Sequence, residues 1–310
     1  MARFSIGTAI SEAFGLMRRR PLATFVWGLL MVAPSVGSMA LILPILGEML
    51  TAIASEGADP DQVQNAMMGD MMQMQGVSAL LNLVQVVVTV IVYTAVMRAV
   101  VRPRETSFFS LRLGMDELRV AVVGLALVVG FYMLVAIFIL LGVGIGFASW
   151  GLGEPYNWLI IVSLGVGLFV AIWLGAARVS LMVPASVLHR TFAFEEGWKL
   201  GRGRTGALFG MMLLIILIML VVQVIAVGIG SAVFMAAAGG MDWSRIQAAI
   251  EESPIAALTA LFNANWPWVT LAGLAVSVLY GVLVTLGIAP FASACRQLSA
   301  EVAPAAEEGH

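Results

Sequence analysis

Six long stretches of the chain contain no charged residue, and arginine-rich segments lie between some of them. The uncharged stretches are Pro21–Gly47, Met71–Met97, Val120–Gly153, Pro155–Ala177, Thr205–Met241 and Ser253–Cys295. Each is longer than the roughly 20 apolar residues that an α-helix needs to cross a bilayer. The pattern therefore predicts an all-α polytopic membrane protein with six transmembrane helices.

The basic residues between these helices fall almost entirely on one side. If the intervening segments are numbered alternately inside and outside, all of the 16 Lys and Arg residues except Arg245 lie inside. An excess of Lys and Arg marks the cytoplasmic loops of membrane proteins. The basic residues are nearly all arginine, a usage that suggests a GC-rich bacterial genome. We expect a multi-pass protein of the bacterial inner (plasma) membrane with both termini in the cytoplasm.

The composition agrees with this class. Hydrophobic residues make up 61% of the 310 residues and charged residues 11%, and the mean hydropathy is +1.01. Soluble domains carry about 25% charged residues. The net charge of −2 offers no electrostatic support for binding nucleic acid. We expect one membrane domain over residues 1–310, and its single cysteine, Cys295, excludes an intramolecular disulfide.

The chain reads as three copies of one unit, each a cytoplasmic amphipathic helix at the interface followed by two spans. The segment Ser11–Arg20 aligns with Glu195–Arg204 through a shared order of acidic, small, aromatic, Leu and two Arg positions. The middle segment, Phe108–Arg119, fits loosely. Parallel repeats place equivalent helices around an axis along the membrane normal. The expected units are 1–102, 103–190 and 191–300, with a flexible tail over 301–310.

The returning helices of the three units also end alike. Pro184 precedes Arg190 by six residues, and Pro290 precedes Arg296 by six; Arg98 holds the same place in the first unit. The amphipathic helices offer aromatic and basic side chains to lipid headgroups or to a partner. These candidate contacts are Phe14, Arg18, Arg20, Trp198, Arg202 and Arg204. Alternatively, the helices only anchor the spans.

Polar residues inside the predicted spans are few. Asn82, Gln85 and Thr89 lie three to four residues apart and so share one helical face, and Gln223 lies in the fifth span. Intramembrane polar groups mark transport paths or binding sites, but they also form hydrogen bonds between packed helices. No ionisable residue lies near the middle of a span, which argues against a proton-coupled transporter.

Small residues spaced four apart predict close contacts between helices. The spacing occurs at Gly142 and Gly146, at Gly206 and Gly210, and at Gly273, Ser277 and Gly281. It favours a compact bundle and indicates no ligand.

Methionines crowd the end of the first outside loop, where the chain enters the second span. They are Met67, Met68, Met71, Met72 and Met74. Thioethers bind soft Cu(I), which makes this a weak candidate metal site. The alternative is an amphipathic helix in which methionine fills irregular apolar surface, and no His or Cys accompanies the cluster.

Catalytic patterns are missing from the sequence. The two histidines, His189 and His310, cannot build a His-rich metal site. There is no Gly-x-Ser-x-Gly elbow and no phosphate-binding loop. The acidic pairs Asp116–Glu117 and Glu195–Glu196 are adjacent, so the two carboxylates of a pair point in different directions; we interpret them as solvated groups or partners of nearby arginines. We expect no enzymatic activity and no cofactor.

The stretch from Pro184 to Phe209 resembles part of a bacterial family of six-span proteins. In that family a proline near the end of span four precedes an amphipathic helix with the order acidic, small, aromatic, Leu, basic, and span five follows. The family includes the membrane domain of glycerophosphoryl diester phosphodiesterases and related inner-membrane proteins. The resemblance implies a membrane fold. It carries over no catalytic residue, because the phosphodiesterase chemistry belongs to a separate soluble barrel that has no counterpart in residues 1–310.

These patterns favour a non-enzymatic integral inner-membrane protein that supports envelope or lipid organisation or scaffolds a partner. Its expected partners are membrane lipids and either another protein or further copies of itself. The alternative is a passive or weakly coupled transporter or channel for a small or amphipathic solute. The polarity of the bundle interior distinguishes the two, since a cavity lined by the amides favours the transporter.

Overall fold

The computed structural model describes residues 4–54, 60–104, 108–150, 153–238, 244 and 254–307, and every regular element within them is helical. The elements are α1 (Ile6–Arg19), α2 (Pro21–Ala54), α3 (Pro60–Val101), η1 (Phe108–Ser110), α4 (Met115–Ser149), α5 (Tyr156–Val179), α6 (Met182–His189), α7 (Phe194–Gly201), α8 (Thr205–Ala238) and α10 (Pro254–Glu307). Helix α10 thus includes residues 301–307 of the segment predicted as a tail, whose flexibility stays a prediction.

Six stretches of these helices are long and apolar enough to cross a membrane. They are Pro21–Ile45, Met71–Val101, Met115–Ser149, Tyr156–His189, Thr205–Val233 and Trp266–Val302. Each overlaps one of the uncharged stretches of the sequence. The prediction of an all-helical protein with six candidate spans is therefore confirmed.

The helices divide between two compact units. Unit 1 comprises residues 1–19, 93–218 and 286–310, and unit 2 comprises residues 20–92 and 219–285. Three helices contribute to both units, since α3, α8 and α10 each have residues in unit 1 and in unit 2.

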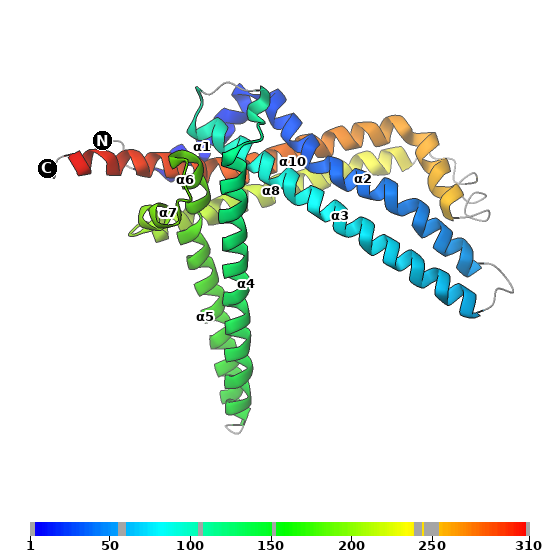
Figure 1. Ribbon diagram of the computed structural model, residues 1–310, viewed down its shortest axis with the longest axis horizontal. Coiled ribbons are helices and arrows are strands. Elements are labelled where there is room, and N and C mark those ends of the chain that lie inside the picture. The colour runs from blue at the N-terminus through cyan, green and yellow to red at the C-terminus, as the bar shows by residue number, and fades with distance from the viewer. Residues whose placement is uncertain are drawn as a thin grey trace. The chain divides into compact units, whose positions relative to one another are not determined.

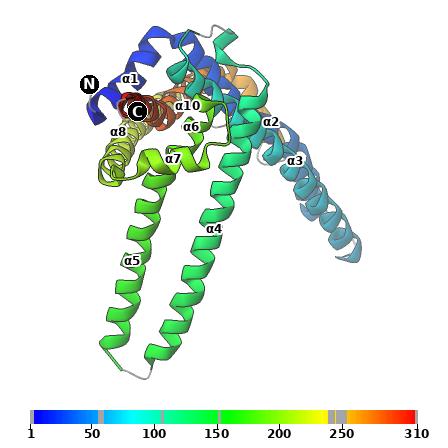
Figure 2. The ribbon, with the colours of Figure 1, turned by 60° about the vertical axis from the view of Figure 1, so that its left-hand side comes forward.

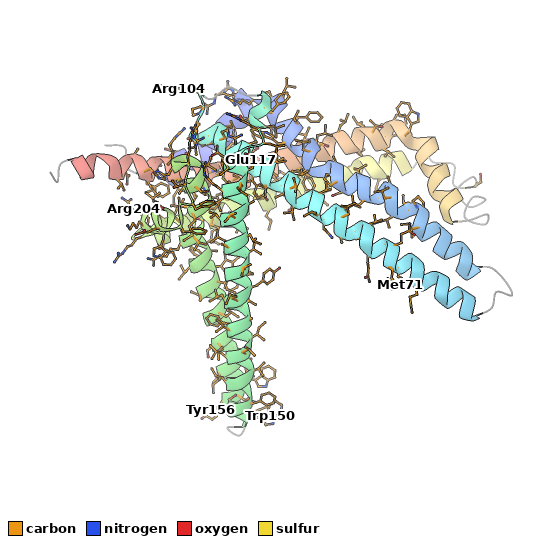
Figure 3. The ribbon with its side chains drawn as sticks, in the orientation of Figure 1. Met71, Arg104, Glu117, Trp150, Tyr156 and Arg204 are labelled. Atoms are coloured by element: carbon orange, nitrogen blue, oxygen red, sulfur yellow. The ribbon has the colours of Figure 1, made fainter. Side chains whose placement is uncertain are left out.

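In unit 1, α4 and α5 form a long antiparallel hairpin (Figures 1 and 2). Its apolar side chains are widely exposed, as at Leu140 (72% exposed) and Phe169 (61%), which suits helices surrounded by lipid. Trp150 and Tyr156 lie at the turn of the hairpin, and Glu117 lies at its other end (Figure 3). One end of the hairpin therefore carries aromatic residues, and the other end carries charged residues.

The two amphipathic helices pack their small residues against the rest of unit 1. In α1, Ala9 and Ala13 are fully buried. In α7, Gly197 lies against the backbone of Met182, and Gly201 lies against the carbonyl of Arg178, so closely that neither position has room for a side chain. Both helices are therefore held by the protein itself as well as by any membrane surface.

In unit 2, α2 and α10 approach each other through small residues. Gly28 of α2 lies against the backbone of Ser277 and Gly281, and Gly281 in turn lies against the carbonyl of Thr24. The close contact predicted for Ser277 and Gly281 is therefore confirmed. Among the described residues, no such neighbour lies within 4 Å of Gly142, Gly146, Gly206 or Gly273, and Gly210 meets only the side chain of Ile6. Close contact was wrongly predicted at these positions.

Replacing Gly28 by Leu should destabilise the protein, because the new side chain would collide with the α10 backbone. We expect a loss of about 1–3 kcal/mol in the free energy of unfolding, the usual cost of overpacking. The matched control is Gly142→Leu, at a position with open space. Thermal unfolding in nanodiscs measures both; equal stability of the two variants would contradict the α2–α10 contact.

Candidate functional site

A cavity of about 190 Å³ opens between α2 and α3 within unit 2. Its walls carry hydroxyl and amide groups in the middle of two apolar helices. The lining residues are Pro34, Ser35, Ser38, Ile42, Ser78, Leu81, Asn82 and Gln85. None of these lining side chains is charged, so the cavity can form hydrogen bonds but offers no counter-ion.

Two of the predicted polar residues, Asn82 and Gln85, lie together in this cavity. Among the residues that the structure describes, their side-chain amides take part in no hydrogen bond, so the interhelical hydrogen bonds considered as an alternative are not formed here. Thr89 lies one turn further along α3, where its hydroxyl donates to the Gln85 carbonyl at 2.7 Å. Gln223 is exposed on α8 and does not line the cavity.

The sequence analysis missed the residues that α2 contributes. Ser35 and Ser38 lie three residues apart and follow Pro34, which removes one hydrogen bond from the helix. Ser78 extends the face of Asn82 and Gln85 by one turn. A serine pair beside a proline inside a span was the available signal; small polar residues in spans are common, which made it easy to pass over.

A second cluster of polar groups lies in unit 1, where the end of α3 meets the start of α4. We call it the ion-pair cluster; its members are Arg98, Arg102, Asp116, Glu117 and Arg119. Arg98 is 3% exposed and donates to Glu117 at 2.7 Å, and Arg102 and Arg119 donate to Asp116 at 3.0 and 2.9 Å. The prediction that Asp116 and Glu117 are partners of nearby arginines is confirmed.

Hydrogen bonds to the backbone extend the ion-pair cluster. Arg98 donates to the Ser110 carbonyl at 2.9 Å, and Ser110 has a left-handed φ of 57° that a non-glycine residue rarely adopts. Arg102 donates to the carbonyl of Val187 on α6. The cluster therefore connects α3, the turn around η1, α4 and α6.

An analogous pair joins α10 to α1. Arg296 donates to Glu12 at 2.6 Å and to the carbonyl of Val100 at 2.7 Å, and Ser293 donates to the same carboxylate at 2.7 Å. Glu301 further along α10 accepts from the backbone amide of Phe4 and from Arg204 at 3.1 Å. Arg204, a predicted lipid contact, is thus already paired within the protein.

Most of the other predicted interfacial residues lie at the surface of unit 1. Phe14 is 46% and Trp198 42% exposed. The Arg178 guanidinium lies 4.0 Å from the centre of the Trp198 ring, a cation–π contact. Arg18 and Arg202 are exposed, whereas Arg20, which belongs to unit 2, is half-buried.

The acidic side of α7 is solvated, as predicted. Glu195 and Lys199 pair at 2.6 Å with both side chains largely exposed. The Lys199 ammonium lowers the pKa of Glu195, and the carboxylate raises the pKa of Lys199. An exposed pair of this kind adds little to stability.

Candidate metal ligands do not converge in the part of the chain that the structure describes: no group of three or more His, Cys, Asp or Glu residues could hold a metal ion. The side chains of Met68, Met71 and Met72 on α3 are exposed. Met74 is half-buried, and the Met67 side chain lies outside the described residues. The weak Cu(I) site stays a prediction.

Comparison with known proteins identifies no relative, since no family model, curated protein or solved structure matches this chain.

The ion-pair cluster predicts that removing one charge of the buried Arg98–Glu117 pair destabilises the protein more than removing both. Arg98→Met should cost about 3–5 kcal/mol of unfolding free energy, because it removes the partner of the buried Glu117. The double variant Arg98→Met/Glu117→Leu should lose less than Arg98→Met alone, since no buried carboxylate remains at position 117. Denaturation in nanodiscs provides the measurement, with Lys199→Ala, at an exposed pair, as the control that leaves stability unchanged. A double variant as unstable as the sum of the two single variants would contradict the analysis.

Proposed function

We propose that this protein is a non-enzymatic integral protein of the bacterial inner membrane that organises lipid at its cytoplasmic surface. The observation that carries the proposal is the packing of α1 and α7. Each helix turns small residues into unit 1 and leaves an aromatic residue, Phe14 or Trp198, exposed. An exposed arginine lies near its C-terminal end, Arg18 within α1 and Arg202 directly after α7. Exposed aromatic and arginine side chains beside membrane spans suit anionic headgroups. The same surface could instead scaffold a protein partner, and the lipid-retention experiment below distinguishes the two functions.

The three-hairpin repeat is part of the proposal. Aligned positions in the first and third sequence repeats, residues 1–102 and 191–300, support it. Ala13 and Gly197 are both buried, and the following residues, Phe14 and Trp198, are exposed to similar degrees, 46% and 42%. Such agreement is expected if the two helices occupy equivalent places.

The ion pairs support the same repeat. Arg98, at the end of the proposed repeat 1–102, pairs with Glu117 near the start of the repeat 103–190. Arg296, at the end of the repeat 191–300, pairs with Glu12 near the start of the repeat 1–102. Each ion pair thus joins the end of one sequence repeat to the amphipathic segment of another repeat. Three units arranged around an axis would bring these ends together in this order.

We also propose that both termini are cytoplasmic, since the basic residues gather at one end of the spans. Glu154, beside the aromatic turn of the α4–α5 hairpin, should then face the outside and Arg112 the inside. In a Cys295→Ser background, a membrane-impermeant maleimide added to intact spheroplasts should label Glu154→Cys and not Arg112→Cys. Labelling of Arg112→Cys alone would reverse the orientation.

The lipid function predicts a specific loss of anionic lipid. Arg202→Ala and Arg18→Ala should each reduce the phosphatidylglycerol retained by the purified protein about fivefold, the effect of roughly one kcal/mol per basic residue. Native mass spectrometry of protein from mixed phosphatidylglycerol and phosphatidylcholine nanodiscs measures the retention.

The matched control is Arg112→Ala, which removes an exposed arginine outside α1 and α7. Equal retention by all three variants would contradict a lipid site on these helices. If Trp198→Ala releases a protein that otherwise co-purifies in stoichiometric amount, and lipid retention does not change, the function is scaffolding of a partner and not lipid organisation.

The transport alternative keeps one observation in its favour, the polar cavity at Asn82 and Gln85. It requires solute flux through proteoliposomes that Gln85→Leu abolishes while the variant still folds. Gln223, the third residue expected on such a path, does not line the cavity, which favours the lipid function. The resemblance to the phosphodiesterase membrane domain stays a proposal of a shared fold and adds no activity.

A further inference from the structure

The cavity of unit 2 has the chemistry of a binding site for an uncharged polar group. We propose that it binds the head of a neutral amphiphile that carries hydroxyl and ester groups, of the diacylglycerol class. This extends the proposed lipid function to a second site with a different ligand. Its residues are distinct from those of α1 and α7, so the two proposals can fail separately.

The depth of the cavity is the first reason. Asn82 and Gln85 lie near the middle of the candidate span Met71–Val101. Hydrocarbon supplies no hydrogen bonds, and each unsatisfied polar group there costs several kcal/mol. Since the two amides have no hydrogen-bonding partner among the described residues, a partner from outside the chain would be strongly favoured.

The hydrogen-bonding groups of the walls define what that partner offers. Amide side chains both donate and accept. Ser38 uses its proton on the Ser35 carbonyl at 2.7 Å, so its oxygen remains an acceptor. A ligand with a hydroxyl donor and ester carbonyl acceptors matches both kinds of group.

The absence of charge among the lining residues selects against ordinary phospholipid heads. A phosphate at this depth would lie in low dielectric without a cation beside it, which is expensive. A neutral head avoids that cost, and neutral amphiphiles are free to sink below the charged headgroups.

The size and surroundings of the cavity fit an amphiphile better than a freely soluble solute. Its volume of about 190 Å³ is far above the roughly 10–15 Å³ that a single bound water needs, which leaves room for a glycerol-sized head. Apolar side chains near the cavity are widely exposed: Val36 (61%), Leu80 (63%) and Leu83 (61%). Acyl chains attached to the head can lie along this apolar surface.

The test measures retention of dioleoylglycerol by the full-length protein. The protein is placed in phosphatidylcholine nanodiscs that contain phosphatidylglycerol and dioleoylglycerol as minor lipids, and native mass spectrometry identifies the retained lipid. Gln85→Leu and Asn82→Leu should each weaken retention of dioleoylglycerol about tenfold, the effect of one lost hydrogen bond. Ser78→Ala is the milder variant, which removes a wall hydroxyl without adding volume.

The matched control is Gln223→Leu, the same substitution on an exposed glutamine of another span in unit 2. It should retain dioleoylglycerol like the unchanged protein. A diazirine-labelled diacylglycerol should crosslink to peptides of α2 and α3, and Gln85→Leu should remove that crosslink.

Several outcomes would overturn the proposal. Equal retention by the cavity variants and the control would remove the site, and so would a cavity that holds water only. Preferential loss of phosphatidylglycerol from Gln85→Leu would show that the head is anionic. Conversion of a dimer to a monomer by Gln85→Leu would assign the cavity to a second copy of the chain. Loss of dioleoylglycerol with phosphatidylglycerol retention intact would support this site alone, independently of the α1 and α7 surface.

Discussion

Arg98 lies at the end of an apolar helix with 3% of its side chain exposed, where an unpaired guanidinium could not remain. Its contacts with Glu117 and the Ser110 carbonyl satisfy that charge and hold the turn from α3 to α4. Arg296 does the same for α10, α1 and the end of α3. The ends of the helices in unit 1 are thus held by ion pairs. Arg98 and Glu117 are buried, so removing either one alone is costly, whereas Arg296 is 37% exposed.

Inside the spans, the cost of burying charge has a different consequence: the polar groups that line the cavity of unit 2 are neutral. Charges gather where helices end and water or headgroups are near, whereas the polar groups that line the described cavity of unit 2 are hydroxyls and amides, such as those of Ser38 and Gln85. A neutral polar group at mid-span needs a partner yet tolerates hydrocarbon better than a charge does. This division separates a surface suited to anionic heads from a cavity suited to a neutral one.

Several features were readable from the sequence because they depend on local composition. The candidate spans follow from runs without charge, such as Thr205–Met241. The burial of Ala13 and exposure of Arg18 follow from the amphipathic pattern of one helix. Asn82 and Gln85 stood out because a polar group in an apolar helix is costly wherever that helix packs. Pairing of Asp116 and Glu117 with arginines was expected from the nearby charges, but the choice of Arg98 for Glu117 was not.

By itself, then, the sequence determined the helices, their membrane-spanning character and the residues that must find polar partners, since hydrophobicity and helical period are local properties. Only the tertiary structure decided which partner each one has. It placed Ser35 and Ser38 opposite Asn82, left Gln223 outside the cavity, and joined Glu12 to Arg296 across most of the chain. It also showed close contact at Gly28 and none at Gly142. The reason is that spacing within one helix defines a face, whereas the element that covers that face depends on how distant segments pack.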